Sequence, residues 1–177
     1  MKIKLIISSL LVSSVFMSAV HAADGAIKFT GKITASACKV DSGSMDQPVN
    51  MGTVSSNSFN GMGSTSSPTP FNIKLTDCPK EYKNAYVKFD GQTDRTNNRY
   101  LALQNNGSEI AAQGVALAIY ELNNSSYPLA ITQRSMAYPL IENQSNVLSF
   151  VAKYIATGDK VTAGSGNSLA NFTITYN

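Results

Sequence analysis

The sequence is poor in charged side chains and in histidine. Of its 177 residues only 14% are charged, and His21 is the single histidine. A charged fraction so far below the usual quarter argues against a disordered chain, a coiled coil or a protein of long helices. The formal net charge of +3 is too small for a basic nucleic-acid binder. This composition favours one β-rich globular domain, because two domains of half this length would each bury too little surface.

The only long apolar run stands at the amino terminus. Lys2 and Lys4 precede apolar residues 5–20, and small side chains follow around Ala22. This order predicts a secretory signal peptide over residues 1–22, removed before Ala23. A membrane anchor is the alternative, but the run is short for a span and is interrupted by serines.

Removal of that leader would also remove the only histidine. A mature chain without imidazole has no Ser-His-Asp triad, no Cys-His nucleophile pair and no histidine-ligated metal. A glycosidase built on paired carboxylates remains an alternative, but the acidic side chains stand singly along the sequence. Glycine-rich phosphate-binding motifs are also missing. We therefore expect a protein that is not an enzyme and that holds neither a metal nor a cofactor.

The two cysteines, Cys38 and Cys78, fit neither a C-x-x-C redox motif nor a zinc cluster. An even number of cysteines in an exported chain favours a disulfide, with two buried free thiols as the alternative. Closing a loop of about 41 residues would stabilise the fold by roughly 4 kcal/mol on the chain-entropy estimate.

Apolar and polar residues alternate along most of the remaining chain, without a convincing helical period. Nine short strands bounded by Gly- and Asn-rich turns predict an all-β antiparallel sandwich. The expected strands are 26–36, 49–54, 70–76, 84–90, 99–104, 114–122, 128–133, 146–156 and 168–176. Residues 55–69, rich in serine and glycine, are expected to form a mobile loop.

The first expected strand is strongly two-sided. Ile27, Phe29, Gly31 and Ile33 share one face, and lysines and threonines occupy the other. The segment is therefore either the first strand of the sandwich, with Gly31 at a bulge or a close backbone approach, or an amphipathic segment with another role.

The carboxyl-terminal segment alternates just as regularly. Phe172, Ile174 and Tyr176 are separated by threonines, and the sequence ends one residue later at Asn177. A strand that continues to the terminus without a tail suggests that the terminus itself is docked.

Taken in order, these features resemble the structural subunits, or pilins, of chaperone–usher fimbriae, close to the type 1 fimbrial subunits of enteric bacteria. The resemblance covers the whole expected mature chain. It includes the I-x-F-x-G-x-I segment before Cys38, the triplet Asp77-Cys78-Pro79, the alternation at residues 150–154, Gly164 fourteenth from the end, and the penultimate Tyr176.

The resemblance implies an incomplete immunoglobulin-like sandwich that lacks its last strand, plus an amino-terminal donor-strand arm. Its domains would be a signal peptide at 1–22, a donor-strand extension at 23–36 and a pilin domain at 37–177. A chaperone, and then the next subunit, would supply the missing strand; such β-strand addition is established for chaperone–pilin complexes. The implied partners are a periplasmic chaperone, an outer-membrane usher and neighbouring subunits in a surface fimbrium, with no nucleic acid.

The resemblance also assigns roles to residues. The donor strand would be Ile27, Phe29, Gly31 and Ile33. The acceptor groove and chaperone-recognition residues would be Gly164, Phe172, Ile174, Tyr176 and Asn177. A carbohydrate-binding adhesin or lectin-like secreted module is the alternative function, although the chain has no room for the additional lectin domain of the family's tip adhesins.

Overall fold

The computed structural model describes residues 24–34 and 36–177, so the expected signal peptide at 1–22 lies outside the described residues. The chain divides into two units at Ile33 and Thr34. We call the described part of the first unit, residues 24–33, the arm, and the second unit, residues 34–177, the body.

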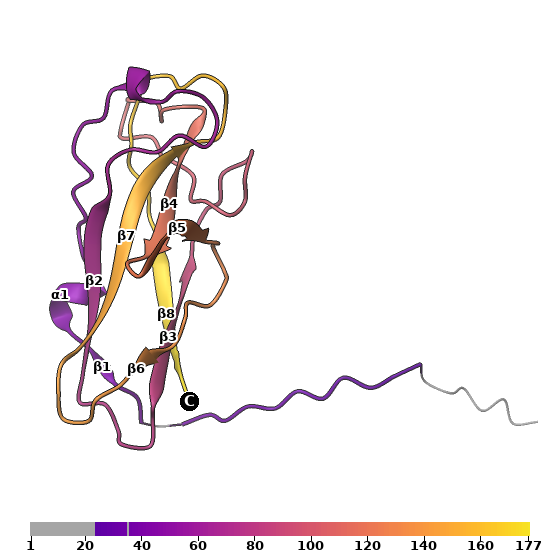
Figure 1. Cartoon of the computed structure of the whole chain (residues 1–177), viewed down its shortest axis with the longest axis vertical. Coiled ribbons are helices and arrows are strands. Elements are labelled where there is room, and N and C mark those ends of the chain that lie inside the picture. Colours follow the sequence, from indigo (N-terminus) through magenta and orange to yellow (C-terminus); the bar gives the residue numbers. More distant parts are fainter. Residues whose placement is uncertain (1–23, 35) are drawn as a thin grey trace, which may run out of the picture. The chain divides into compact units, whose positions relative to one another are not determined.

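The body is built from strands, with two helical turns (Figure 1). The two turns are α1 (Ser42–Met45), capped by the Asp41 side chain, and the 3₁₀ turn η1 (Ser56–Ser58). The strands are β1 (Lys39–Val40), β2 (Thr69–Thr76), β3 (Asn84–Asp90), β4 (Val115–Glu121), β5 (Asn124–Leu129), β6 (Tyr138–Pro139), β7 (Asn146–Ala156) and β8 (Asn171–Tyr176).

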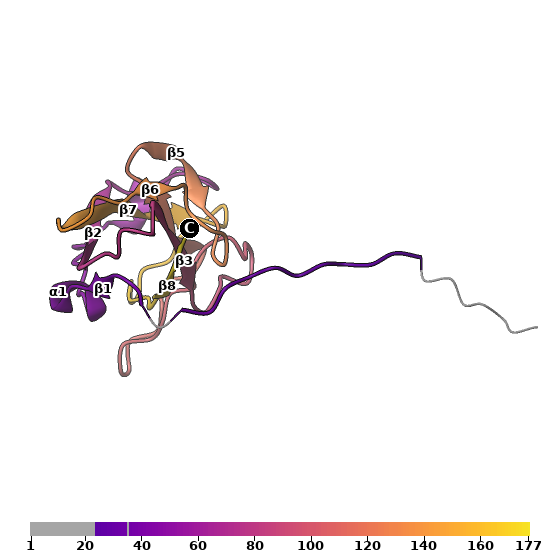
Figure 2. The same ribbon diagram turned by 90° about the horizontal axis from the view of Figure 1, so that it is seen from below.

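These strands form two sheets, and Figure 2 shows the body from below. The first sheet has the order β1-β2-β7-β4-β5 and the second has the order β6-β3-β8. All the pairings between these strands are antiparallel. The coarse prediction of an all-β protein with two antiparallel sheets is therefore confirmed.

The core lies between the sheets, where alternate side chains of β2, β3 and β7 meet. Phe150 on β7 is fully buried and is the centre of an aromatic cluster. Its ring lies 5.6 Å from Phe71, 5.0 Å from Phe89 and 5.6 Å from Tyr138. The inward-facing side chains of the long strands therefore pack together in one shared core.

The structure corrects several of the expected strands. Residues 84–90 and 146–156 form strands with the expected bounds, and 70–76, 114–122 and 168–176 differ only at their ends. The described part of 26–36 and residues 49–54 are not strands, and 99–104 makes only isolated bridges. Strand β5 occupies 124–129 rather than 128–133, because Asn124 already pairs with Glu121 of β4.

The serine- and glycine-rich stretch 55–69 is more ordered than its composition indicates. Its second half runs beside β7, where the Gly63 and Ser66 backbone N–H groups donate to the carbonyls of Ala156 and Tyr154. The Ser66 hydroxyl also accepts from the Tyr154 N–H. The expectation of a mobile loop overlooked these hydrogen bonds, which composition alone does not reveal. In the part of the chain that the structure describes, no helix is long and apolar enough to cross a membrane.

Candidate functional site

Strand β8 is an uninterrupted sheet edge. It pairs with β3 along its whole length, from Asn171 opposite Asp90 to Tyr176 opposite Ala85, and no described residue pairs with its other side. The other three edges of the two sheets are shortened or broken. Strands β1 and β6 have two residues each, and β5 contains Pro128 and an irregular register. Natural proteins use these devices to prevent an edge from pairing with another chain, and β8 lacks them.

The inward side chains of β8 are only partly covered. Phe172, Ile174 and Tyr176 pack against the core cluster but remain half-buried, whereas the alternating Thr173 and Thr175 are exposed. A strand flanked on both sides would bury its inward face fully, as β7 does at Leu148 and Phe150. The half-burial therefore follows from the missing neighbour.

A second free backbone edge faces β8. After α1 the chain continues through residues 47–54, which we call the rim segment. Within the described residues, the rim segment makes no backbone-to-backbone hydrogen bond. Its one hydrogen bond to a side chain runs from the Gly52 N–H to the Asn50 side-chain oxygen. Unpaired N–H and C=O groups on two facing segments are suited to a strand placed between them.

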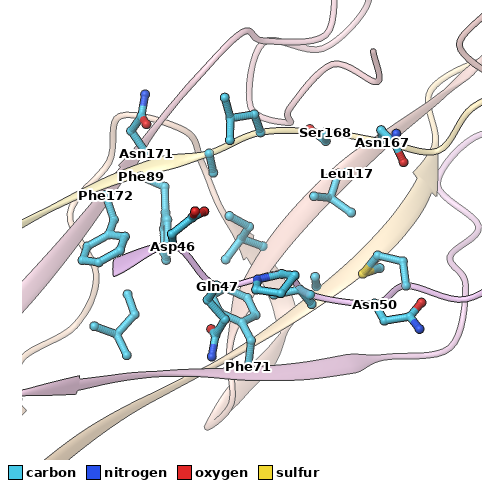
Figure 3. A pocket seen from close by; sticks show the side chains of 18 of the residues that line it. Asp46, Gln47, Asn50, Phe71, Phe89, Leu117, Asn167, Ser168, Asn171 and Phe172 are labelled. Carbon is cyan, nitrogen blue, oxygen red and sulfur yellow. The ribbon is translucent and has the colours of Figure 1, made fainter. Parts of the chain in front are cut away.

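Between β8 and the rim segment lies an apolar groove of about 830 Å³ (Figure 3). Its floor is made of core side chains from four strands. These are Phe71 and Ile73 of β2, Phe89 of β3, Leu117 and Ile119 of β4, and Ala152 of β7. The groove is therefore an opening into the hydrophobic core and not a polar active-site cleft.

A smaller compartment of about 380 Å³ continues the groove beyond the start of β8. The two compartments share four lining residues, which are Gly52, Tyr154, Gly166 and Asn167. The Tyr154 hydroxyl donates to the Gly166 carbonyl at 2.9 Å, and a Cβ on Gly166 would lie 2.5 Å from that hydroxyl. Gly164 lines this compartment too, and a Cβ there would lie 2.6 Å from the Ala112 nitrogen. Both glycines allow close backbone packing at this end of the groove.

The carboxyl terminus is held on β3, as the sequence suggested. The Asn177 carbonyl accepts from the Lys83 N–H at 2.7 Å, and its N–H donates to the Asn84 carbonyl at 3.2 Å. Its side-chain amide donates to the Tyr86 hydroxyl at 3.0 Å. The exposed last residue is therefore fixed beside the end of β8.

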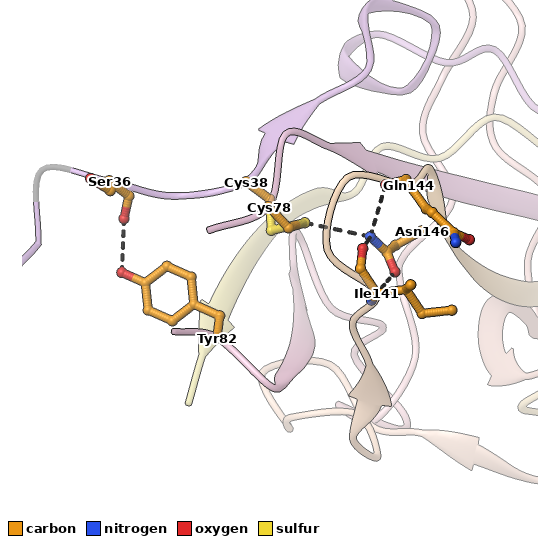
Figure 4. The surroundings of a disulfide bond; sticks show 7 residues. All are labelled: Ser36, Cys38, Cys78, Tyr82, Ile141, Gln144 and Asn146. Atoms are coloured by element: carbon orange, nitrogen blue, oxygen red, sulfur yellow. Dashed lines mark hydrogen bonds between the residues drawn. A yellow bond between two sulfur atoms is a disulfide. The ribbon is translucent and has the colours of Figure 1, made fainter. Parts of the chain in front are cut away.

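Tyr176 joins this end of β8 to the start of the body. Its ring stacks on Tyr82 at 4.9 Å, and the Tyr82 hydroxyl donates to the Ser36 carbonyl at 2.8 Å (Figure 4). Burial raises the pKa of Tyr176, Tyr82 raises it further, and a backbone hydrogen bond with Cys38 opposes both effects. The segment that follows the arm is thus tied to the last strand.

The predicted disulfide is present between Cys38 and Cys78 (Figure 4). Beside it, the side chain of buried Asn146 accepts from the Ile141 N–H at 2.7 Å and donates to the Ile141 carbonyl at 3.0 Å. The same amide lies 3.6 Å from the Cys78 sulfur. The bridge is embedded in ordered structure where the body begins.

The apolar side chains of the arm are not in a sheet. Ile27, Phe29 and Ile33 are 83%, 91% and 101% exposed, and nothing lies within 4 Å of a Cβ built on Gly31. Exposed apolar residues in a regular alternating pattern are typical of a surface that binds another polypeptide. The interpretation of this segment as the first strand of the sandwich is therefore wrong for the described residues.

The structure brings some of the predicted acceptor residues together. Phe172 lines the groove and Gly164 lines the smaller compartment. Ile174 and Tyr176, further along β8, and Asn177, which follows the strand, are outside both linings. Sequence reasoning missed the floor and the rim segment. The alternation at 71–73 and 117–119 marks the floor residues as inward-facing, yet it carries no sign that this part of the core is open.

No group of three or more potential metal-ligating side chains occurs within residues 24–34 and 36–177. The groove instead has free backbone on both sides and an apolar floor.

The comparisons with known proteins agree with this geometry. A family model described as "Fimbrial protein" matches residues 27–177. The chain is 36% identical to the fimbrial-like protein SfmA of Escherichia coli K12, over 99% of each chain. It is 38% identical to the type-1 fimbrial protein A chain of Salmonella typhi, over 89% of this chain and 85% of that one.

Two solved structures extend the likeness to the fold. A type I fimbria protein of Burkholderia pseudomallei is 36% identical and superposes with a TM-score of 0.59, over 81% of this chain and 91% of that one. The P pilus rod subunit PapA, 22% identical, superposes with a TM-score of 0.64, over 80% of this chain and all of that one. The chain therefore belongs to the fimbrial protein family and is a structural, non-enzymatic subunit of surface fimbriae.

Proposed function

We propose that this subunit polymerises by donor-strand exchange, with its arm as the donor and the groove beside β8 as the acceptor. The domains are then a signal peptide at 1–22, a donor-strand extension at 23–36 and a pilin domain at 37–177. The pilin domain is an immunoglobulin-like sandwich without its final strand. The observation that carries this proposal is the coexistence of an unpaired β8 edge over an apolar groove and an exposed, alternating arm.

The fit between donor and acceptor is physical. Ile27, Phe29 and Ile33 share one face of an extended strand and would enter the apolar groove. Burying each side chain contributes roughly 1.5–3 kcal/mol, which gives about 5–9 kcal/mol before backbone pairing. That is comparable with the entire stability of a typical domain. The family resemblance implies in addition that Gly31 faces a position of the groove where a side chain would not fit.

An empty groove is a hazard, so the subunit needs a strand at each stage of its life. In this proposal a periplasmic chaperone first supplies one, and its basic residues hold the carboxylate of Asn177. At the outer-membrane usher the arm of the next subunit then replaces the chaperone strand. The docking of Asn177 on β3 supports this role, because it presents the terminal carboxylate in a fixed position.

Deletion of residues 23–33 tests the proposal. The shortened subunit is expected to accept a strand but not to donate one, so it should accumulate as a chaperone complex and form no fibre by itself. The matched control keeps the arm's length but replaces Ile27, Phe29 and Ile33 with serine, and it should behave like the deletion. Electron microscopy and a polymer ladder on unheated gels provide the readout. Fibres of normal length from the deleted subunit would rule the proposal out.

A further inference from the structure

The charges around the groove have one sign. Among the described residues, Asp46, just before the rim segment, is the only charged residue that lines the larger compartment, and Glu109 is the only one that lines the smaller compartment. Both carboxylates are exposed. Figure 3 shows Asp46 between the rim segment and the strand that carries Asn171 and Phe172. A strand lying in the groove would therefore meet negative charge at its borders.

These carboxylates are available for a partner. The single salt bridge among the described residues joins Lys39 to Asp77, away from both compartments. Asp46 accepts no hydrogen bond from another described side chain or backbone group. Asp46 is also not part of the hydrophobic core, so it has no evident role in stabilising the body.

The arm carries the opposite charge on the matching face. Lys28 and Lys32 lie on the face opposite Ile27, Phe29 and Ile33, and the alternating part of the arm contains no acidic residue. The one arm carboxylate, Asp24, precedes that alternation. When the apolar face enters the groove, both lysines point outward, toward the level of the rim. At about 3.3 Å per residue they are roughly 13 Å apart, so one arm can meet charges at separated places along the groove.

We propose that Asp46 and Glu109 select the lysine-bearing arm of a second copy of this chain. This inference rests on the proposed donor-strand function and adds its specificity: the apolar face supplies the affinity, and the paired charges choose the donor and its register. Electrostatic complementarity acts mainly on partner choice and association rate. A donor with acidic residues at the positions of Lys28 and Lys32 would be disfavoured by like-charge repulsion.

Charge reversal in the full-length subunit tests the inference. The variants are Asp46→Lys with Glu109→Lys, Lys28→Glu with Lys32→Glu, and the combination of all four substitutions. Asp46→Lys alone is also made, for comparison with the controls. Chaperone-held subunits are mixed with usher membranes, and the rate of polymer growth is followed on unheated gels. Exposed ion pairs of this kind change rates or equilibria by about two- to fivefold. We expect each reversal alone to slow growth by about that factor and the combination to restore most of the loss.

Two controls separate charge recognition from damage to the fold. Glu142→Lys makes the same change in net charge at an exposed residue outside both compartments, and it should leave the growth rate unchanged. In about 1 M salt, where charges are screened beyond about 3 Å, Asp46→Lys and the original subunit should grow at the same rate. A structural defect would persist at high salt.

The outcomes distinguish this inference from the function beneath it. Slowing by either reversal, rescue by the combination and loss of the difference in salt support charge selection. Unchanged growth of the reversed subunits, or slowing that salt and the combination leave intact, overturns charge selection. In either case, if deletion of residues 23–33 still blocks growth, donor-strand exchange stands. Growth of the deleted subunit overturns the proposed function itself.

Discussion

At the scale of single residues, the tyrosines connect the core to its surroundings. Tyr138 lies against Phe150 and donates its hydroxyl hydrogen bond to the Ser149 carbonyl at 3.1 Å. Burial, with a smaller contribution from the Glu121 carboxylate, raises the pKa of Tyr138 to about 12. Ionisation of this hydroxyl is therefore much less favourable in the folded subunit than in the unfolded chain.

We expect alkaline pH to destabilise the subunit. The unfolded tyrosine ionises near pH 10 and the folded Tyr138 near pH 12, so the unfolded state holds fewer protons between these values. The contribution of Tyr138 to the free energy of unfolding is therefore fully present below pH 10 and declines as the pH rises toward 12. Urea midpoints from pH 8 to 12 measure the decline. Tyr138→Phe should make it shallower, and an identical decline in that variant would contradict the assignment.

Gly31 gives a second prediction for one residue. With nothing near its Cβ position in the free arm, Gly31→Leu should leave the folding of the body unaffected. In the groove of the next subunit the added side chain would meet the packed floor. Strand exchange should therefore slow markedly, seen as chaperone complexes that persist after usher is added. Thr30→Leu, on the outward face, is the matched control and should exchange at the original rate.

At the scale of secondary-structure elements, β8 and the rim segment are the two segments with unpaired backbone groups that border the groove. Their backbone amides should exchange with solvent rapidly while no strand lies between them. In assembled fibres the same amides should be protected, because an inserted strand accepts their hydrogen bonds. Hydrogen exchange read by mass spectrometry measures this change, with residues 148–152 of β7 as an internal reference protected in both states. Equal exchange of β8 in the two states would argue against strand insertion.

The elements also show what sequence reasoning could reach. Strands 84–90 and 146–156 were predictable because their side chains alternate between the core and the opposite face. Each of these strands also pairs with a neighbouring strand on both sides. The arm and residues 49–54 have the same alternation, but no neighbouring strand in their own chain. The alternation of apolar and polar side chains indicates that one face of a segment is buried. It does not indicate whether the strand that buries this face belongs to the same molecule. A groove along the core was expected only from the family resemblance, since an opening in a core leaves no local pattern.

At the scale of the whole molecule, the proposed strand donation from one subunit to the next would be a head-to-tail contact that does not close on itself. Such contacts build open filaments rather than rings or dimers. A subunit that accepts but cannot donate should then end a filament wherever it is incorporated. Mixing the 23–33 deletion with the original subunit should shorten fibres in proportion to the fraction added. Fibre lengths measured by electron microscopy test this, and lengths that do not depend on the fraction would exclude the head-to-tail arrangement.

In such a filament the disulfide would also transmit mechanical force. A stretching force would reach each body through the chain that leaves the arm, a few residues before Cys38. The covalent bridge to Cys78 passes that force directly to the chain between β2 and β3, so it does not have to be borne by the two-residue strand β1. Tension along the fibre would thus be delivered to the chain between β2 and β3, and the short pairing of β1 with β2 would be shielded from it.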